Sequence, residues 1–596
     1  MSDGPDSRYD LALGPFLGQI AARLEELPHE SIKNLLLAHA RGLTRSERSA
    51  FHNMLLTDVP VATENIVIEP DGELLDDISS LRQNLSDGSY YDGWGWDDEI
   101  HDERSFGDES WVDEMDALFD RAAGEFWARN YELACTAYGR LLTIFDMSED
   151  GGTFSGPRPP EEMVESDLDE AAARYLRCLY HTTKPKERVP ALSDAVRKLA
   201  LLYVARVSMK AVIDAEVDSL PGLARFFDEW KTALTTMETG RFSGSYIDNP
   251  LRRRLLREVF ALDGGADGLA ELARKDGSHH AEAYHDWVTA LIDSGRNEEA
   301  LAAAQEGAEK ILQNRLKAKM CDRLAELASE LGRTQVSVNA RRKAWRIEPK
   351  QSRLQDLLGE AASDPAEIES RAIEEHEWGR ESDIKLADNL AGLLEVLVGD
   401  FAAAQTRLLK AKVLGWSNTT HPGQVVFPCL LLAGSASTFI DNRTVIAQMF
   451  HKIDRPEDQW QSRQYALDEG DNKNQEIQPA ELNSEILSRH ALSALIMLLM
   501  NRQQVPETDR ENLLKNAEKV ARHRTKSIVS NTHRKAYGRA AEVLIAVAEA
   551  WHLADNKHRS KSLLSWARSQ FPRHSAFKRE LNSAEARSPL LSSKTS

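Results

Sequence analysis

The chain has 596 residues, of which 42% are hydrophobic, 28% charged and 7% aromatic. This length exceeds what one hydrophobic core serves, so we expect several compact units or an elongated repeat array, and the composition excludes a wholly disordered chain. No apolar run approaches the roughly 18 residues of a membrane-spanning helix, and no secretory signal pattern opens the sequence. Four scattered cysteines argue against a disulfide framework or a Cys-based zinc site, so we predict a cytoplasmic protein with no membrane segment.

Charge is distributed unevenly along the chain, whose net charge is -21. Residues 1–150 hold 11 Lys and Arg against 32 Asp and Glu, whereas residues 501–596 hold 19 against 9. The acidic end is expected to repel nucleic acid and anionic membranes, and the basic end to attract either. The simpler interpretation is that both ends carry ordinary solvated helix faces.

Residues 1–69 are predicted to form a small N-terminal helical module. Apolar residues recur at helical spacing from Leu11 to Leu24, Pro28 interrupts the pattern, and two more helices are expected before Leu55. A β-branched run at 66–68 indicates one isolated strand.

Residues 70–112 are predicted to be an acidic, aromatic-rich linker, because glycines interrupt the segment and helical periodicity is absent. Aromatic side chains among acids suit a segment that becomes ordered against a basic and apolar partner surface. The candidate partner-binding residues are Tyr90, Tyr91, Trp94, Trp96, Phe106 and Trp111. Two other interpretations stay open: the tryptophans pack on a neighbouring helix, or the linker is a cleavable hinge and the chain a proteolytic target.

Helical patterns resume at residue 113. We expect a helical region with a divergent repeat at 113–265, a solenoid at 266–452, a polar loop at 453–482, a basic C-terminal helical unit at 483–583 and a disordered tail at 584–596. Within the first region, 148–165 is predicted to be a second linker, and 189–216 one helix. The glycine-rich stretch 263–268 lacks the lysine and the strand of a phosphate-binding loop, so it indicates a turn between helices.

Two consecutive helix pairs repeat between residues 283 and 349, with Gly295 and Gly332 37 residues apart. The first pair carries Tyr284, Trp287, Val288, Leu291, Gly295, Ala300, Ala304 and Ala308, and the second carries Cys321, Leu324, Ala325, Ala328, Gly332, Ser337, Arg341, Ala344 and Pro349. Less regular pairs occur at 122–141, 392–411 and 541–572, the last with its glycine replaced.

These pairs resemble tetratricopeptide repeats (TPRs). In that motif small residues let two antiparallel helices approach closely, glycine adopts a left-handed turn and proline ends the second helix. Ser337 and Arg341 depart from the usual pattern. The resemblance implies an all-α, TPR-like α-solenoid of antiparallel helix hairpins, joined to the small N-terminal module. It also implies a non-catalytic scaffold or adaptor that binds a protein partner in an intracellular complex.

Motifs for chemistry are absent from the sequence. No phosphate-cradling loop, dinucleotide fingerprint or His-Glu-x-x-His occurs, so we assign no catalytic residue, no cofactor and no metal ligand. Cys178 and His181 lie three residues apart on a predicted helix and would be the reacting pair of an unrecognised enzyme. A small buried cysteine beside a surface histidine is the more usual meaning of that spacing.

The C-terminal basic helices carry the alternative function, a regulatory subunit that contacts nucleic acid. The candidate basic surface is Arg559, Arg568 and Arg573, interleaved with aromatic residues that stack on bases in single-strand binders. Leu563 and Leu564 place part of this helix against a core instead.

The segment 413–432 joins a polar turn to an apolar stretch. It contains Trp416 and His421, and it indicates either a rigid connection between repeats or an aromatic–His pocket.

Overall fold

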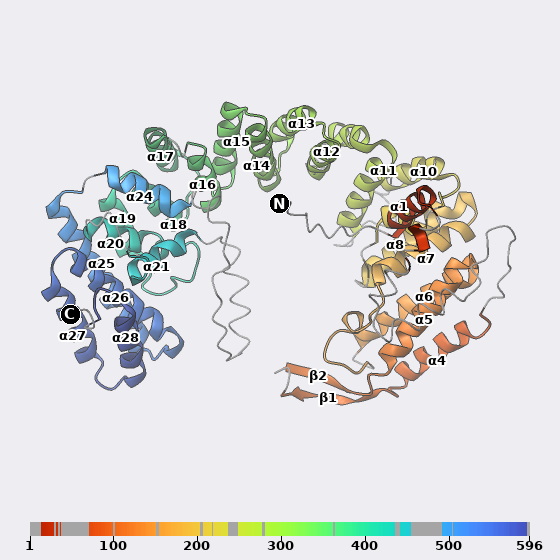
Figure 1. Cartoon of the computed structure of the whole chain (residues 1–596), viewed down its shortest axis with the longest axis horizontal. Coiled ribbons are helices and arrows are strands. Elements are labelled where there is room, and N and C mark those ends of the chain that lie inside the picture. The colour runs from red at the N-terminus through yellow and green to blue at the C-terminus, as the bar shows by residue number, and fades with distance from the viewer. Residues whose placement is uncertain are drawn as a thin grey trace. The chain divides into compact units, whose positions relative to one another are not determined.

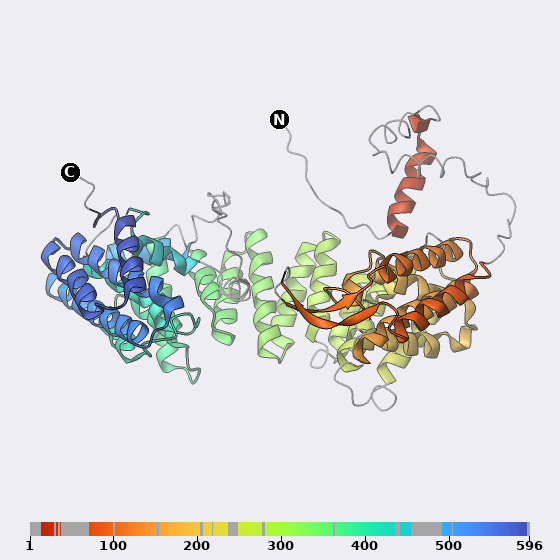
Figure 2. The same ribbon diagram turned by 90° about the horizontal axis from the view of Figure 1, so that it is seen from below.

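The computed structural model describes residues 13–28, 31–33, 36, 71–98, 102–150, 154–202, 205, 207–216, 218–236, 248–276, 281–361, 364–435, 441–454, 491–503 and 505–592 (Figures 1 and 2). It divides into two compact units, Met1–Ala290 and Leu291–Ser596. Both consist mainly of paired helices, which confirms the predicted all-α class. Within the described residues, no helix combines the length and the apolar character that crossing a membrane requires.

Nine helices with described bounds and one two-stranded sheet lie in the first unit, and a tenth helix crosses its boundary. They are α1 (Leu13–Glu26), α4 (Leu74–Ser86), β1 (Tyr91–Asp97), β2 (Asp102–Gly107), α5 (Trp111–Trp127), α6 (Tyr131–Ile144), α7 (Leu168–Thr182), α8 (Arg188–Leu202), α9 (Met209–Asp214), α10 (Leu223–Thr236), α11 (Asp248–Asp276) and α12 (Ala281–Asp293), with short 3-10 turns η1 (Phe145–Asp150), η2 (Pro160–Glu162) and η3 (Pro185–Glu187).

The N-terminal module is described only in part. Helix α1 matches the first predicted helix and ends two residues before Pro28. The remaining predictions for residues 1–69 lie outside the described residues, apart from helical residues at 31–33 and 36.

The predicted linker at 70–112 is wrong, because its described residues, 71–98 and 102–112, are folded. Helix α4 buries Leu74, Ile78, Leu81 and Leu85, a helical spacing that the surrounding acids and serines obscure. Strands β1 and β2 then pair antiparallel, with Trp94 opposite Ser105, and Figure 1 shows them as a separate ribbon beside α4, α5 and α6. The alternation of glycine and tryptophan at 93–96 has the two-residue period of a strand.

The second predicted linker, at 148–165, packs against this hairpin of strands. The N–H of Gly156 donates to the carbonyl of Ser105 at 2.9 Å, and Phe154 meets the ring of Trp111 edge-on, with 5.0 Å between centroids. The region predicted as one helix at 189–216 is two, α8 and α9. Gly265, with φ 56° and ψ -140°, breaks α11 within the predicted turn at 263–268.

The second unit is built from helices throughout its described part. They are α13 (Asn297–Lys310), α14 (Asn314–Glu330), α15 (Thr334–Ile347), α16 (Gln351–Gly359), α17 (Pro365–Glu381), α18 (Asp388–Leu397), α19 (Phe401–Lys410), α20 (Val426–Ser435), α21 (Val445–His451), α24 (Leu492–Arg502), α25 (Glu507–Ser530), α26 (Tyr537–Leu553), α27 (Lys557–Gln570) and α28 (Ser575–Arg587), with 3-10 turns η5 (Pro422–Gln424), η6 (Lys452–Asp454) and η7 (Arg534–Ala536).

Six helix hairpins in the described part of the chain share one turn geometry. A residue with positive φ follows the first helix, and the next N–H donates to the carbonyl four residues before the positive-φ residue, at N···O distances of 2.6 to 3.1 Å. This is the Schellman motif, which satisfies the last carbonyls of a helix. The positive-φ residues are Arg129, Gly295, Gly332, Gly399, Thr532 and Asp555. The turn at Asp555 confirms the predicted repeat without a glycine.

The core of the second unit is centred on α20 and α26. Every residue of α20 is buried, and so are 12 of the 17 residues of α26. The predicted disordered tail at 584–596 is wrong for its first nine residues, because α28 runs to Arg587 and Ser588 is fully buried. The Ser588 hydroxyl donates to Oε1 of Glu549 at 2.6 Å. The polar loop at 453–482 lies outside the described residues after Asp454.

Candidate functional site

The most exposed large aromatic side chains of the described chain lie on β1. Trp94 is 63% exposed and Trp96 59%, whereas most described tryptophans are buried or half-buried. Residues two apart on a strand share a face, so the two indole rings lie side by side on one face of the hairpin. The Trp94 Nε1–H donates to Glu103 at 3.2 Å, and the Trp96 Nε1–H donates to Asp98 at 3.1 Å. Carboxylates therefore hold the polar edges of both rings.

On the opposite face of the hairpin, the cation Arg104 already has partners within the chain. Arg104 ion-pairs with Asp97 and Glu109, and its guanidinium carbon lies 5.1 Å from the centroid of the Phe106 ring. The face with the tryptophans keeps exposed acids around it, namely Asp92, Asp98 and Glu103. We call Trp94, Trp96 and these three acids the tryptophan face.

The structure separates the six predicted partner-binding residues. Trp94 and Trp96 are exposed and adjacent, and Phe106 is 37% exposed on the other face. Trp111 is fully buried, and its Nε1–H donates to the carbonyl of Ser155 at 2.9 Å, so it serves the core and not a partner. Tyr90 donates to Glu114 at 2.7 Å, and Tyr91 is half-buried at a bulge.

The predicted basic surface is largely engaged within its own unit. Arg559 donates to Glu518 at 3.0 Å and its guanidinium lies 4.6 Å from the centroid of Trp551. Arg568 pairs with Glu585. Arg573 is exposed. Two of the three cations are thus already matched by carboxylates, and a site for nucleic acid on this surface stays a prediction.

Cys178 and His181 are not arranged as a reacting pair. Cys178 is fully buried, and burial raises the pKa of its thiol, which is opposite to what a nucleophile needs. The His181 ring stacks on Tyr131, 4.4 Å between centroids, and burial lowers its pKa. Among the described residues, no cluster of three or more His, Cys, Asp or Glu is placed to hold a metal ion.

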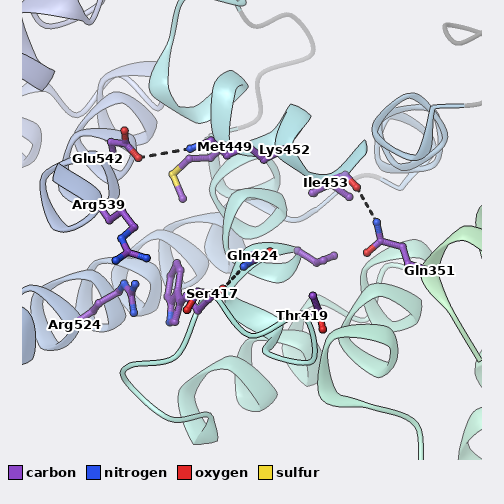
Figure 3. A pocket seen from close by; sticks show the side chains of 12 residues that line it. Gln351, Ser417, Thr419, Gln424, Met449, Lys452, Ile453, Arg524, Arg539 and Glu542 are labelled. Atoms are coloured by element: carbon purple, nitrogen blue, oxygen red, sulfur yellow. Dashed lines mark hydrogen bonds and ion pairs between the residues drawn. The ribbon is translucent and has the colours of Figure 1, made fainter. Parts of the chain in front are cut away.

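A pocket of about 180 Å³ lies in the second unit, and the segment 413–432 supplies part of its wall (Figure 3). Trp416 and Val425 come from this segment, Met449 and Ile453 from α21 and η6, and Arg524 from α25. His421, the second residue of the predicted aromatic–His pocket, does not line this pocket and instead stabilises the turn.

His421 fixes that turn through both of its ring nitrogens. Nδ1 accepts from the N–H of Gly423 at 2.9 Å, and Nε2 lies 2.7 Å from the carbonyl of Lys412. Burial lowers its pKa, so the neutral ring, protonated on Nε2, fits both contacts.

Three cations face this pocket. Arg524 is only 5% exposed, Arg539 comes from α26, and Lys452 lies 3.6 Å from Glu542. Figure 3 shows the guanidinium ends of Arg524 and Arg539 directed towards each other.

In the sequence Arg524 belongs to a basic run on α25, and its spacing carries a more specific signal. On α25 the buried residues Leu514, Ala517, Ala521 and Ile528 follow helical spacing, and Arg524 occupies a position on the same stripe. A cation at a core position of an amphipathic helix indicates an internal electrostatic role.

Comparisons with known proteins show distant likeness in architecture. No protein-family model matches the sequence, and no curated protein does. Similar solved structures include Naa15/Naa10 bound to HypK-THB (13% identity, 86% of this chain and 79% of that chain, TM-score 0.23) and the human IFIT1 dimer with m7Gppp-AAAA (10%, 85% and 96%, 0.17). A third is a signal transduction ATPase with numerous domains that carries a tetratricopeptide repeat sensor, from Pyrococcus horikoshii (14%, 79% and 74%, 0.15).

TM-scores this low assign no function, so the fold assignment depends on the helix hairpins themselves. Their buried small residues, including Ala300, Ala304 and Ala328, and their left-handed turns follow the repeat logic expected from the sequence. The chain is a TPR-like helical-repeat protein.

Proposed function

We propose that this chain is a helical-repeat scaffold that binds a protein partner through the tryptophan face of the β1–β2 hairpin. The occupant is a segment of the partner that carries Lys or Arg beside apolar side chains. The observation that carries this proposal is the pair of exposed indole rings on Trp94 and Trp96, surrounded by carboxylates. The cytoplasm is the proposed location, and the four free thiols of the chain support it.

The energetics favour an interface at this face. A tryptophan buries roughly 150–250 Å² when fully covered. Covering the exposed part of each ring therefore contributes about 2–4 kcal/mol at about 25 cal/mol per Å². A cation seated over an indole face adds about 0.5–2 kcal/mol. Two adjacent tryptophans are thus sufficient to form a hot spot, the small group of residues that supplies most of the binding energy of a protein interface.

Charge complementarity selects the partner. Asp92, Asp98 and Glu103 are exposed around the rings, and the nearby cation Arg104 is ion-paired with Asp97 and Glu109. A basic segment is attracted to this surface and an acidic one is repelled. The helical hairpins would hold this surface within the assembly.

The test uses point substitutions in the full chain, because a deletion of 86–112 would remove the buried Trp111 and disrupt the first unit. A partner captured on the wild-type chain is purified, and its affinity is measured by titration calorimetry. Trp94→Ala with Trp96→Ala should weaken binding by at least about thirtyfold.

The matched control is Trp127→Ala, since Trp127 is 44% exposed on α5, away from the hairpin. Its affinity should stay within about threefold of wild type, and raising the salt concentration should weaken wild-type binding. Equal affinity of the hairpin double variant and the wild type would reject the proposal.

A further inference from the structure

The pocket of the second unit contains a buried cation without a counter-charge. No carboxylate of the described residues is within ion-pair distance of Arg524, and its Nε has no hydrogen-bond partner there. One terminal nitrogen donates to the carbonyl of Val413 at 2.9 Å, and the guanidinium lies 4.3 Å from the centroid of Trp416. These contacts position the guanidinium but do not neutralise it.

Burying an unneutralised guanidinium is costly, and the neighbouring residues add to that cost. Arg539, also without an ion pair among the described residues, lies close enough to repel Arg524. Burial and this repulsion lower the pKa of Arg524 to about 10. An anionic ligand between the two guanidinium groups would supply the missing negative charge.

The charges lining the pocket indicate how much negative charge is missing. Lys452 is matched by Glu542, at 3.6 Å. Arg524 and Arg539 remain, so two positive charges are unmatched. A phosphomonoester carries about -1.5 to -2 near pH 7 and presents three acceptor oxygens, whereas a carboxylate or a sulfate ester carries -1. Arginine forks also match phosphate oxygens in geometry.

Apolar side chains also line the pocket. They include Val425, Met449 and Ile453, and inorganic phosphate alone would leave them uncovered. A ligand with a phosphoryl group and a compact apolar body would contact both the cations and these apolar side chains.

We propose that this pocket binds a small-molecule phosphomonoester, with its phosphoryl group between Arg524 and Arg539 and its apolar body against Val425, Met449 and Ile453. This site is independent of the tryptophan face, because all of its residues belong to the second unit and the hairpin belongs to the first. It would give the scaffold a ligand-dependent stability.

The first experiment titrates the full chain with phenyl phosphate, phenyl sulfate and inorganic phosphate. At pH 7.5 phenyl phosphate should bind at least about tenfold more tightly than either of the others. At pH 5 its advantage over phenyl sulfate should fall to within about threefold, because the second pKa of a phosphate ester is about 6. Equal affinity for phenyl phosphate and phenyl sulfate at pH 7.5 would overturn the assignment of a dianion. Equal affinity for inorganic phosphate would overturn the assignment of an apolar body.

The second experiment assigns the site. Arg539 is exposed, and Arg539→Gln should weaken phenyl phosphate binding at least about tenfold. Arg524→Gln should weaken it further. The control Arg534→Gln changes an exposed arginine five residues from Arg539 and should bind as wild type. Circular dichroism checks each fold, and Arg539→Gln decides the outcome if Arg524→Gln is misfolded. Wild-type affinity in Arg539→Gln would contradict the proposal.

Discussion

Gly332 shows how one backbone conformation defines a repeat. Its φ of 70° places it in the left-handed region, where a side chain is strained, and a Cβ there would meet nothing within 4 Å. Arg129 and Asp555 occupy the equivalent positions of other hairpins despite their side chains. The glycines at 295 and 332 could therefore be predicted from the sequence as turns, whereas Arg129 and Asp555 could not, because only the surrounding helices impose that conformation on them.

Two glycine substitutions can separate the conformational cost of a positive φ from the steric cost of an added Cβ. We expect Gly332→Ala to destabilise the chain by about 1 kcal/mol, because the cost is conformational. Gly124→Ala should stabilise it by about 0.5–1 kcal/mol, since Gly124 is an exposed position inside α5 whose Cβ would also meet nothing within 4 Å. Chemical denaturation of both variants checks this. Equal effects of the same sign would show that the turn conformation is not the cause.

At the scale of elements, apolar periodicity predicted the helices that have regular spacing. Helices α5 and α6 and the pairs α12–α13 and α14–α15 carry regular apolar spacing, and they appear where the sequence placed them. The β1–β2 hairpin was missed because it is short, acidic and interrupted by glycines, and it lacks the β-branched residues that usually mark strands. The sequence offered a pocket at Trp416 as one interpretation, but not the cation Arg524 in its wall, because the two residues meet only through contacts between α25 and a distant turn.

Glu549 joins three elements through one buried carboxyl group. It is fully buried on α26, accepts from the N–H of Ile446 at the start of α21 at 3.0 Å, and accepts from the Ser588 hydroxyl after α28. Burial raises the pKa of Glu549, despite these hydrogen bonds, and Asp441 adds to the effect. The folded chain therefore holds this proton more tightly than the unfolded chain does.

The consequence is a stability that falls as the pH rises from the unfolded pKa of Glu549 through its raised folded pKa. Glu549→Gln keeps an acceptor for Ile446 and a partner for Ser588, and it has no charge to bury. We expect its stability relative to wild type to be greater at pH 7.5 than at pH 4. Thermal unfolding at both pH values measures this, with Glu580→Gln on α28 as control. A difference that does not change with pH would contradict the explanation.

At the scale of the whole molecule, the uneven charge of the sequence predicted distinct surfaces but not which charges are available. In the first unit Arg121 forms ion pairs with Asp71 and Asp77. In the second unit Arg559 pairs with Glu518, and Arg568 pairs with Glu585. After this pairing, the acids around Trp94 and Trp96 remain exposed. Net charge is read directly from a sequence, whereas ion pairs between distant residues depend on the fold.

Hydrogen–deuterium exchange of the full chain, with and without its purified partner, tests the central claim most directly. In the free chain, the amides that pair β1 with β2 should exchange more slowly than those of an unstructured peptide. Addition of the partner should slow exchange further in peptides that cover 91–97 and 102–107. Slowed exchange confined to helical hairpins, with these strands unchanged, would contradict the account.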